Sequence, residues 1–411
     1  MGAVAVAMVS PRTIAFTLPS IVLGLVISHI VRDGWPDWPT WLASLRAFAA
    51  AGAIVAFSWV SALWSAYPLA TVSTAAQATA WLVCCALGAT AMLSEPRRNA
   101  FHMAEGFWLG LLAGLLYLLV EISTNQAIKI FLYNLLHVPK EWLRPHNYFT
   151  WSAGKIVKIS EADLTRNIAP ITLLMWSALS CLRLTSPKQA WRAWSIGLYA
   201  IVAVVIMMSV HETSKVALLA STAIFLLALK KPKWSAGTLR VSWIAACLFV
   251  VPAVLGLYRF DLHNAAWVQQ TLQHRIVIWK HTADMAMTSP VYGVGAGAMY
   301  VMEQTDEQQR APGENYPGVS PHAHNVYLQM WLELGAIGAA LLTLFGLALI
   351  ERMQALPQFD RPYAHATFTA SMTMAAASYG TWQAWFMAMF GLTVICFALA
   401  LRTHKVAPGD A

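Results

Sequence analysis

The feature that most constrains this chain is its series of long, uninterrupted apolar segments, for example Thr13–Val31 and Trp243–Tyr258. The hydrocarbon core of a bilayer is about 30 Å thick and needs about 20 helical residues to cross it. Charged residues make up 11% of the 411 residues, whereas about 25% is usual in soluble domains. Strands of a membrane barrel would alternate in polarity, and these segments do not. The sequence therefore predicts an all-α fold, a polytopic transmembrane helical bundle.

Eleven apolar segments qualify as spans by this criterion. They lie near 13–31, 43–64, 74–94, 104–122, 167–184, 192–209, 214–230, 241–258, 326–350, 364–380 and 383–401. We expect a twelfth span within the first sixty residues, which would put both chain ends on the same side of the membrane. With eleven spans the N-terminus would lie on the opposite side from the C-terminus.

Basic residues gather in the connections on one side of these spans. They are Arg97/Arg98, Arg183/Lys188/Arg192, Lys230/Lys231/Lys233/Arg240, Arg352/Arg361 and Arg402/Lys405. The positive-inside rule makes that side cytoplasmic and gives a cytoplasmic C-terminus. Two long polar stretches, about 123–166 and 259–325, then lie on the outer side. The net charge of +8 fits basic loops beside acidic lipids, so we expect membrane lipids and no nucleic acid as partners.

The 259–325 stretch is long enough to carry function. Within it an apolar stripe at helical spacing predicts an amphipathic helix that ends before Pro290 and carries Arg275. The glycine-rich run 293–297 follows, and because no strand precedes it we interpret it as a flexible turn. The stripe consists of Val268, Leu272, Ile276, Trp279, Ala283 and Met287.

The stretch ends with Ser320-Pro321-His322-Ala323-His324-Asn325 and leads directly into a span. A histidine at this boundary titrates near pH 6.5 and can act as a general base. The alternative is that His324 and Asn325 cap the helix that begins there. Within the span, Glu333 would be costly if it faced lipid, so we expect it to face the bundle interior and to be paired.

Two groups of residues in this region resemble motifs of the bacterial O-antigen ligases, within the wider ligase/polymerase superfamily. The first is His324-Asn325 followed after nine residues by Gly335 and after two more by Gly338. The second is Arg275-x-x-x-Trp279 followed by Pro290 and Gly293-Val294-Gly295. The motifs cover about 213–340 of the chain, and the resemblance in topology covers all of it.

The resemblance implies an inverting glycosyltransferase of lipopolysaccharide biosynthesis, located in the bacterial inner membrane with its active site facing the periplasm. It would move O-antigen polysaccharide from undecaprenyl diphosphate, the donor, to lipid A–core oligosaccharide, the acceptor. His324 and Arg275 occupy the positions of the family's key histidine and arginine. Where the family usually has Ser-Arg at the start of a span, this chain has Ser214-Lys215, which keeps the charge but loses the bidentate geometry.

Five further residues are candidates for binding the diphosphate or the glycan. They are Lys215, Arg166, His322, Asn325 and His211. On this interpretation 1–258 is a transmembrane bundle with its outer loop. The segment 259–325 is a long periplasmic loop carrying catalytic elements, and 326–411 holds the C-terminal transmembrane helices and a cytoplasmic tail.

The chemistry would follow from the charges. A guanidinium matches a diphosphate geometrically, cations stabilise the charge that builds on it as it leaves, and His324 would take the proton of an acceptor hydroxyl. The outer carboxylates are scattered, so we expect neither a metal nor a cofactor. Two alternatives stay open: an O-antigen polymerase that uses the same donor, and a transporter of lipid-linked glycan.

Overall fold

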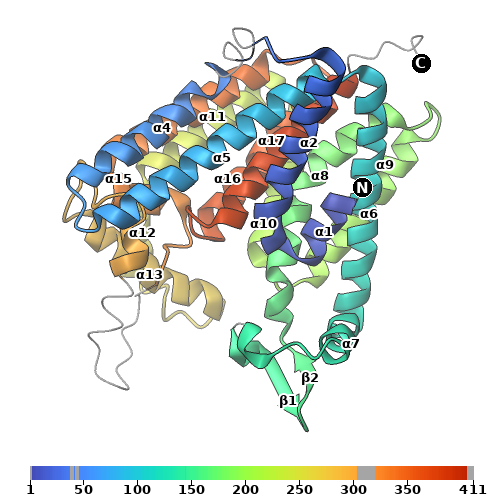
Figure 1. Cartoon of the computed structure of the whole chain (residues 1–411). Coiled ribbons are helices and arrows are strands. Elements are labelled where there is room, and N and C mark those ends of the chain that lie inside the picture. Colours follow the sequence, from blue (N-terminus) through green and yellow to red (C-terminus); the bar gives the residue numbers. More distant parts are fainter. Residues whose placement is uncertain (1, 38–40, 42–45, 144, 303–319, 405–411) are drawn as a thin grey trace.

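The structure is a computed structural model that describes residues 2–37, 41, 46–143, 145–302 and 320–404 (Figure 1). The helices that it describes are α1 (Gly2–Val9), α2 (Ile14–Asp33), α4 (Ala49–Val60), α5 (Pro68–Ser94), α6 (Arg97–Ser123), α7 (Ala127–Leu135), α8 (Thr165–Thr185), α9 (Trp191–Met208), α10 (Glu212–Lys230), α11 (Pro232–Leu248), α12 (Val250–Arg259), α13 (Gln270–Ala286), α15 (Val326–Gln354), α16 (Arg361–Ala377) and α17 (Ala384–His404). One hairpin, β1 (Phe149–Ser152) and β2 (Lys155–Ile159), completes the described elements.

Each of the eleven predicted spans coincides with a helix or, at 241–258, with the pair α11 and α12. Eight helices are long and apolar enough to cross a membrane, and α11–α12, bent by 69°, can form a ninth span. The shorter α4 packs on α5 and α15, and α16 packs on α8, α10 and α15, so both belong to the same bundle. The all-α polytopic class is therefore confirmed, and the chain is a multi-pass membrane protein.

The expected twelfth span is not found in the part of the chain that the structure describes. Helix α1 has eight residues, which give a length of about 12 Å, too short to cross. Arg12, just after it, interacts electrostatically with Asp163 and Arg166, which lie at the opposite end of the bundle from the C-terminal end of α2. The described residues thus place the start of α2 at the opposite end of the bundle from its C-terminal end, and they contain eight helices, or nine spans with the bent pair, that could cross a membrane.

The predicted grouping of basic connections on one side is visible as contacts between them. Arg183 donates to the Phe359 carbonyl, Arg240 to Glu351, and Arg352 to the Arg46 carbonyl. We call this the basic end. The described parts of the two outer stretches, 123–143, 145–166, 259–302 and 320–325, lie at the other end, towards the bottom of Figure 1, which we call the cavity end.

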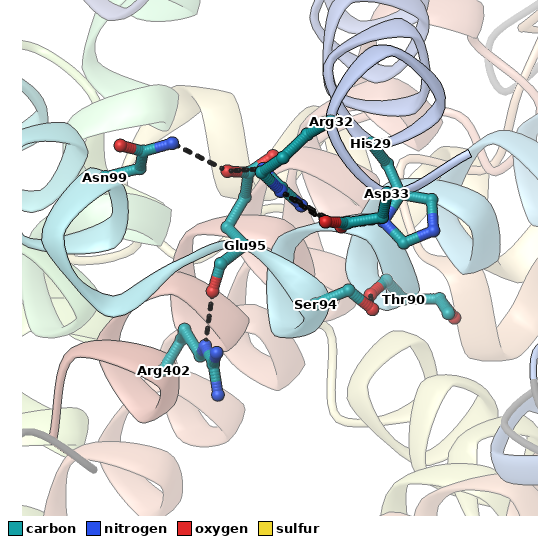
Figure 2. Close-up of polar contacts among 8 residues, drawn as sticks. All are labelled: His29, Arg32, Asp33, Thr90, Ser94, Glu95, Asn99 and Arg402. Carbon is teal, nitrogen blue, oxygen red and sulfur yellow. Dashed lines mark hydrogen bonds and ion pairs between the residues drawn. The ribbon is translucent and has the colours of Figure 1, made fainter.

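Glu95 holds three helices together at the basic end (Figure 2). Its side chain is fully buried, and its Oε2 accepts from Arg32 Nη1 at 2.9 Å and from Asn99 Nδ2 at 3.2 Å. Its backbone carbonyl accepts from Arg402 Nε at 2.6 Å. Because a buried charge without its partner is strongly destabilising, these contacts fix the ends of α2 and α17 to the turn between α5 and α6.

Helix α8 lies at the centre of the bundle. All residues from Asn167 to Leu182 are buried, and α6, α9, α16 and α17 pack around it. Its buried Thr172 shares one hydroxyl proton between the Ser214 hydroxyl on α10, at 2.8 Å, and the Ile168 carbonyl, at 3.2 Å. Because other helices pack around α8, its position in the bundle is fixed. Its first turn therefore has a fixed position at the cavity end.

Helix α15 is broken at Gly335, and the glycine-rich segment 290–297 fills the break. Gly335 has φ 63° and ψ −161°, a conformation essentially confined to glycine. A break frees amides on its C-terminal side and carbonyls on its N-terminal side, and these must find other partners in a membrane. The segment supplies them: Ala336 N donates to Pro290 O (2.8 Å), Ile337 N to Val291 O (3.3 Å), Val294 N to Leu332 O (3.0 Å) and Gly295 N to Glu333 O (2.9 Å).

The expected flexible turn at 293–297 is thus a fixed segment. Gly293 has φ 70°, and a Cβ there would lie 2.3 Å from the backbone carbon of Glu333. Gly293 permits the backbone of the segment to approach the backbone of α15, whereas a Cβ at Gly295 or Gly297 would meet the side chain of Ser65 or Thr74.

Changing Gly335 to Ala should destabilise the protein by at least about 1–3 kcal/mol, the usual cost of forcing a side chain into this backbone conformation. A Cβ at Gly335 would also lie 2.3 Å from the Val291 carbonyl oxygen. Unfolding in detergent, followed by circular dichroism, measures the loss. Gly237→Ala in α11, where a Cβ meets nothing within 4 Å, is the control and should be neutral or slightly stabilising. Equal stability of the two variants would contradict the assignment.

Candidate functional site

A cavity of about 880 Å³ opens at the cavity end. Its walls come from the hairpin, the start of α8, the α9–α10 turn, the first half of α13, the segment before α15 and the turn between α16 and α17. The lining residues that carry the argument below are Tyr148, Lys158, Arg166, His211, Thr213, Arg275, His322, His324, Ser378, Tyr379 and Gln383.

Five of the seven residues singled out in the sequence line this one cavity: Arg166, His211, Arg275, His322 and His324. They come from four segments that are far apart in the chain. Helices α8, α10, α13 and α15 each begin or run at the cavity end, so the bundle brings those segments together. The result is a concave site with two guanidinium groups and three imidazoles.

Helix α13 positions Arg275 and the histidine segment together. Arg275 donates through Nη1 to the Thr213 hydroxyl at 3.4 Å. One turn further, the indole of Trp279 donates to the Ala323 carbonyl at 2.8 Å, between the two histidines. Residues four apart share a face of a helix, so the Arg-x-x-x-Trp spacing places a cation in the cavity and fixes the adjoining wall.

His324 has a defined tautomer. Its Nδ1 lies 2.8 Å from the Ser378 carbonyl oxygen, and since a carbonyl only accepts, the proton is on Nδ1 and Nε2 keeps a lone pair. The residue has a positive φ of 53°, a strained backbone of the kind that occurs at functional sites. Burial lowers the pKa of His324, and nearby Arg275 lowers it further, against the Ser378 hydrogen bond, which raises it. At neutral pH the imidazole is an uncharged base.

His322 lies beside it, with ring centroids 4.2 Å apart. Burial lowers the pKa of His322 to about 3, helped by His324, Arg166 and Arg275. Gln383 Nε2 approaches His322 Nε2 at 3.4 Å, and an amide nitrogen can only donate, so Nε2 is the acceptor. Neither histidine competes with the arginines for an anion, because both stay neutral.

The two arginines of the cavity have no carboxylate partner within the described residues. Burial lowers the pKa of Arg275 somewhat, but a guanidinium remains charged at neutral pH. Two of the lining carboxylates are neutralised elsewhere: Asp163 pairs with Lys129 and Glu212 pairs with Lys215. The third lining carboxylate, Glu161, stands against three lining cations, Lys158, Arg166 and Arg275. The cavity lining therefore keeps a net positive charge, which favours an anionic ligand.

The other two candidates lie apart from this lining. Lys215 pairs with Glu212, Nζ to Oε1 at 2.9 Å. Asn325 is the N-cap of α15, where its Oδ1 accepts from Leu328 N at 3.1 Å, as the capping alternative supposed. His211 does line the cavity, but its Nδ1 is held by the Ser214 hydroxyl at 2.7 Å, and burial lowers its pKa to about 4.

Several lining residues were not anticipated from the sequence. Thr213 bridges Arg275 and the Ala377 carbonyl, and burial raises the pKa of Tyr379, whose ring stacks on His211. Nothing in the short 378–383 turn marks it as functional. The hairpin does carry a signal: alternating polarity on both sides of Ala153-Gly154, both with positive φ, is typical of a two-residue hairpin turn.

Glu333 is buried and paired, as expected, and its partners connect three segments. Its carboxylate accepts from Gly297 N at 2.8 Å, from Gln329 Nε2 at 3.1 Å, and from the Trp382 indole. Gln329 in turn accepts from the amide and hydroxyl of Thr381. Trp382 and Thr381 belong to the turn that supplies Ser378 to His324, so Glu333 fixes that turn to α15.

Among the described residues no three His, Cys, Asp or Glu side chains gather where they could hold a metal ion. The metal-independent reaction expected from the sequence stays a prediction.

The fold and the cavity together define a multi-pass membrane protein with a cationic, histidine-lined site at one end of its bundle. A family model described as O-antigen ligase (Wzy_C) matches residues 171–343, a segment that contains Arg275, His324, Gly335 and Gly338. That segment is less than half of the chain, and over it the chain is similar to the O-antigen ligases.

Similar proteins are known from Rickettsia. A protein of Rickettsia felis, provisionally named a polysaccharide ligase, is 24% identical over 336 residues, 81% of this chain and 75% of that protein. One of Rickettsia conorii with the same provisional description is 22% identical over 366 residues, 88% of this chain and 80% of that protein. Both likenesses extend well beyond the segment that the family model matches.

Replacing Glu333 with Gln should destabilise the protein. One carboxylate oxygen would become an amide nitrogen, which cannot accept the hydrogen bonds that the carboxylate accepts. Each buried donor left without an acceptor costs about 1–3 kcal/mol. Glu351→Gln is the matched control on the same helix. Its side chain is 63% exposed and pairs with Arg240, and a surface pair contributes about 0–1 kcal/mol. Thermal unfolding of the two variants in detergent measures the difference, and an unaffected Glu333→Gln variant would show that the carboxylate is not needed there.

Proposed function

We propose that this protein is an inverting glycosyltransferase that moves a polysaccharide from undecaprenyl diphosphate to lipid A–core oligosaccharide. The observation that carries the proposal is that Arg166, Arg275 and the lone pair of His324 belong to one cavity at the end of the spans. Support also comes from the O-antigen ligase match and from the polysaccharide ligase names of the relatives.

The donor's diphosphate would lie against the two guanidinium groups. Both are without a carboxylate partner within the described residues, and guanidinium binds phosphate oxygens in pairs. As the bond between the sugar's anomeric carbon and the phosphate oxygen breaks, the electron pair leaves with the diphosphate. Fixed cations in a partly water-excluded cavity stabilise that growing charge without having to reorganise.

His324 would act as the general base. Its Nε2 takes the proton from an acceptor hydroxyl while the hydroxyl oxygen attacks the anomeric carbon from the side opposite the diphosphate, which inverts the configuration. The resulting imidazolium is stabilised by its Nδ1–H bond to the Ser378 carbonyl. Base catalysis of this kind contributes about 10²–10⁴ in rate.

The membrane orientation belongs to the same proposal. The basic end would be cytoplasmic by the positive-inside rule, which turns the cavity towards the periplasm and leaves the C-terminus in the cytoplasm. In the bacterial inner membrane this is the leaflet on which a translocated lipid-linked glycan would meet its acceptor.

The closest alternative is a polymerase that uses the same donor and transfers to another carrier-linked glycan. Both reactions use the same diphosphate donor, which the arginines would bind, and a sugar hydroxyl, which His324 would deprotonate. The charges of the cavity therefore fit either acceptor. A transporter is less well supported, because transport sites lie near the bilayer midplane between broken helices. Here the break in α15 is filled by the segment 290–297.

Reconstitution tests the proposal directly. The purified protein in liposomes, given carrier-linked glycan and both kinds of acceptor, should attach glycan to lipid A–core, as detected by a mobility shift. His324→Ala should lower this activity by about 10²–10⁴ while the protein stays folded. His102→Ala, which changes an exposed histidine on α6, is the control. Glycan transfer only to carrier-linked glycan would establish the polymerase, and activity unchanged in His324→Ala would exclude the assigned base.

Arg275→Lys should lower glycan transfer by about 10- to 100-fold, because a charged hydrogen bond contributes about 1.5–3 kcal/mol and lysine cannot form the paired contact. Arg259→Lys, at an exposed position in α12, controls for a general effect of the change and should be neutral. If Arg275→Lys transfers glycan at the normal rate, the guanidinium geometry has no part in the reaction.

The pH dependence follows from the lowered pKa of His324. The neutral imidazole is the active form, so activity is present above this pKa and is lost as the pH falls through it. The acid limb of kcat/KM should therefore lie below pH 6.5, the ordinary histidine value. A profile measured from pH 4.5 to 8 checks this, and an acid limb above 6.5 would show that the catalytic base is another group.

A further inference from the structure

Helix α7 follows α6 at the cavity end. It buries a charged side chain and exposes apolar ones, the opposite of a helix on a water-exposed surface. Its inward face carries Lys129, which is 8% exposed, whereas Phe131 is 63% and Leu135 57% exposed. Leu132 and Leu136, on the neighbouring row, are exposed as well. Contiguous exposed apolar side chains of this kind mark an interaction surface.

The inward face is fixed by polar contacts, so the orientation of α7 is determined. Lys129 Nζ pairs with Asp163 at 2.5 Å, and its backbone amide donates to Glu121 Oε1 at 3.0 Å. The Asn134 side chain forms two hydrogen bonds with β2. Its Nδ2 donates to the Ile156 carbonyl at 2.9 Å, and its Oδ1 accepts from the Ile156 backbone amide at 2.8 Å. A rotation of α7 that buried its leucines would break all of these bonds.

The exposed apolar face of α7 continues a lipid-facing row of α6. Leu116 and Val120 are both exposed on that span, and Thr124 follows at the same spacing of four residues, on the same face. Thr124 lines a groove together with Phe131 and Leu135. The exposed row of α6 therefore adjoins the exposed apolar face of α7.

That groove, about 730 Å³, runs between α7 and β2. Its apolar wall is formed by Ile130, Phe131, Leu135 and Val157, and Lys155 is its cation. Lys155 is exposed and forms no ion pair within the described residues. A groove with an apolar wall and one ammonium group without an ion-pair partner is suited to bind an acyl chain whose phosphate lies beside that ammonium group.

We propose that α7 lies in the headgroup region of the bilayer and that the groove between α7 and β2 binds an anionic phospholipid. The acyl chain lies against Phe131, Leu135 and Val157, and the phosphate binds Lys155. This site is separate from the catalytic cavity, and the proposal does not rest on the glycosyl transfer. The hairpin joins the two, because Lys158 of the same strand lines the catalytic cavity. A bound lipid thus steadies a wall of the active site.

Photolabelling of the full chain tests the lipid site. The protein is placed in nanodiscs of phosphatidylglycerol that carry a diazirine near the middle of an acyl chain, irradiated and digested, and the labelled peptides are identified by mass spectrometry. We expect label on the peptides that contain 127–136 and 155–159, as well as on the α6 peptide around Leu116. Label on α6 alone, in the same sample, would overturn the proposal.

Two pairs of variants refine the test. Phe131→Ser combined with Leu135→Ser should reduce labelling of the 155–159 peptide at least threefold, whereas Leu229→Ser, at a 55% exposed position on α10, should leave it unchanged. Lys155→Gln should weaken labelling by phosphatidylglycerol by about fivefold, the effect of one basic residue near an anionic surface. Labelling by a phosphatidylcholine probe should change little.

Lys158→Gln on the same strand is the charge control and should leave both probes unaffected. Equal losses in Lys155→Gln and Lys158→Gln, or equal losses with both lipids, would show that the groove does not recognise the phosphate through Lys155. These readouts involve no glycan, so their failure is distinct from a failure of the proposed transferase.

Discussion

The backbone pairing between the segment 290–297 and the broken α15 is the interaction on which the rest of the site depends. The break at Gly335 would leave free amides and carbonyls inside a membrane, and the segment satisfies them from both sides. Because the segment follows α13 and the first half of α15 follows His324, this pairing joins the helix that carries Arg275 to the helix whose start carries the histidines. Glu333 adds the 378–383 turn to the same unit. The site is therefore held together by groups that lie outside the cavity lining.

The electrostatics of the cavity depend on which groups remain neutral. Burial and the neighbouring arginines lower the pKa of His211, His322 and His324, so that three imidazoles can share a small space with two guanidinium groups. Two of the three lining carboxylates, Asp163 and Glu212, are paired with lysines instead. An anion entering the cavity meets a net positive charge and imidazoles that are already neutral.

The sequence predicted what apolar length and short motifs can specify. Each of the eleven predicted segments coincides with a helix or with the pair α11 and α12, and within the described residues eight helices, or nine spans with that bent pair, are long and apolar enough to cross a membrane. The amphipathic helix ending before Pro290, the buried position of Glu333 and five residues of the cavity lining also agree with the structure. It did not predict features that depend on long-range contact. The run at 293–297 looked like a flexible turn because its partner, the α15 backbone, lies about forty residues away in the chain. Thr213 and Tyr379 carry no local signal, and the pairing of Lys215 with Glu212 could not be predicted either; whether Lys215 binds the substrate stays a prediction. The expected twelfth span is not found among the described residues, because α1 is too short.

The break in α15 has a consequence for how the protein responds to bilayers of different thickness. A continuous helix accommodates a thicker or thinner hydrocarbon layer by tilting as a unit, and a residue at its end moves with it. In this chain the segment 290–297 is bonded to both sides of the break, to Leu332 and Glu333 before Gly335 and to Ala336 and Ile337 after it. Neither part of α15 can therefore tilt without acting on that segment. We expect a change in bilayer thickness to be transmitted through the segment to α13, which carries Arg275.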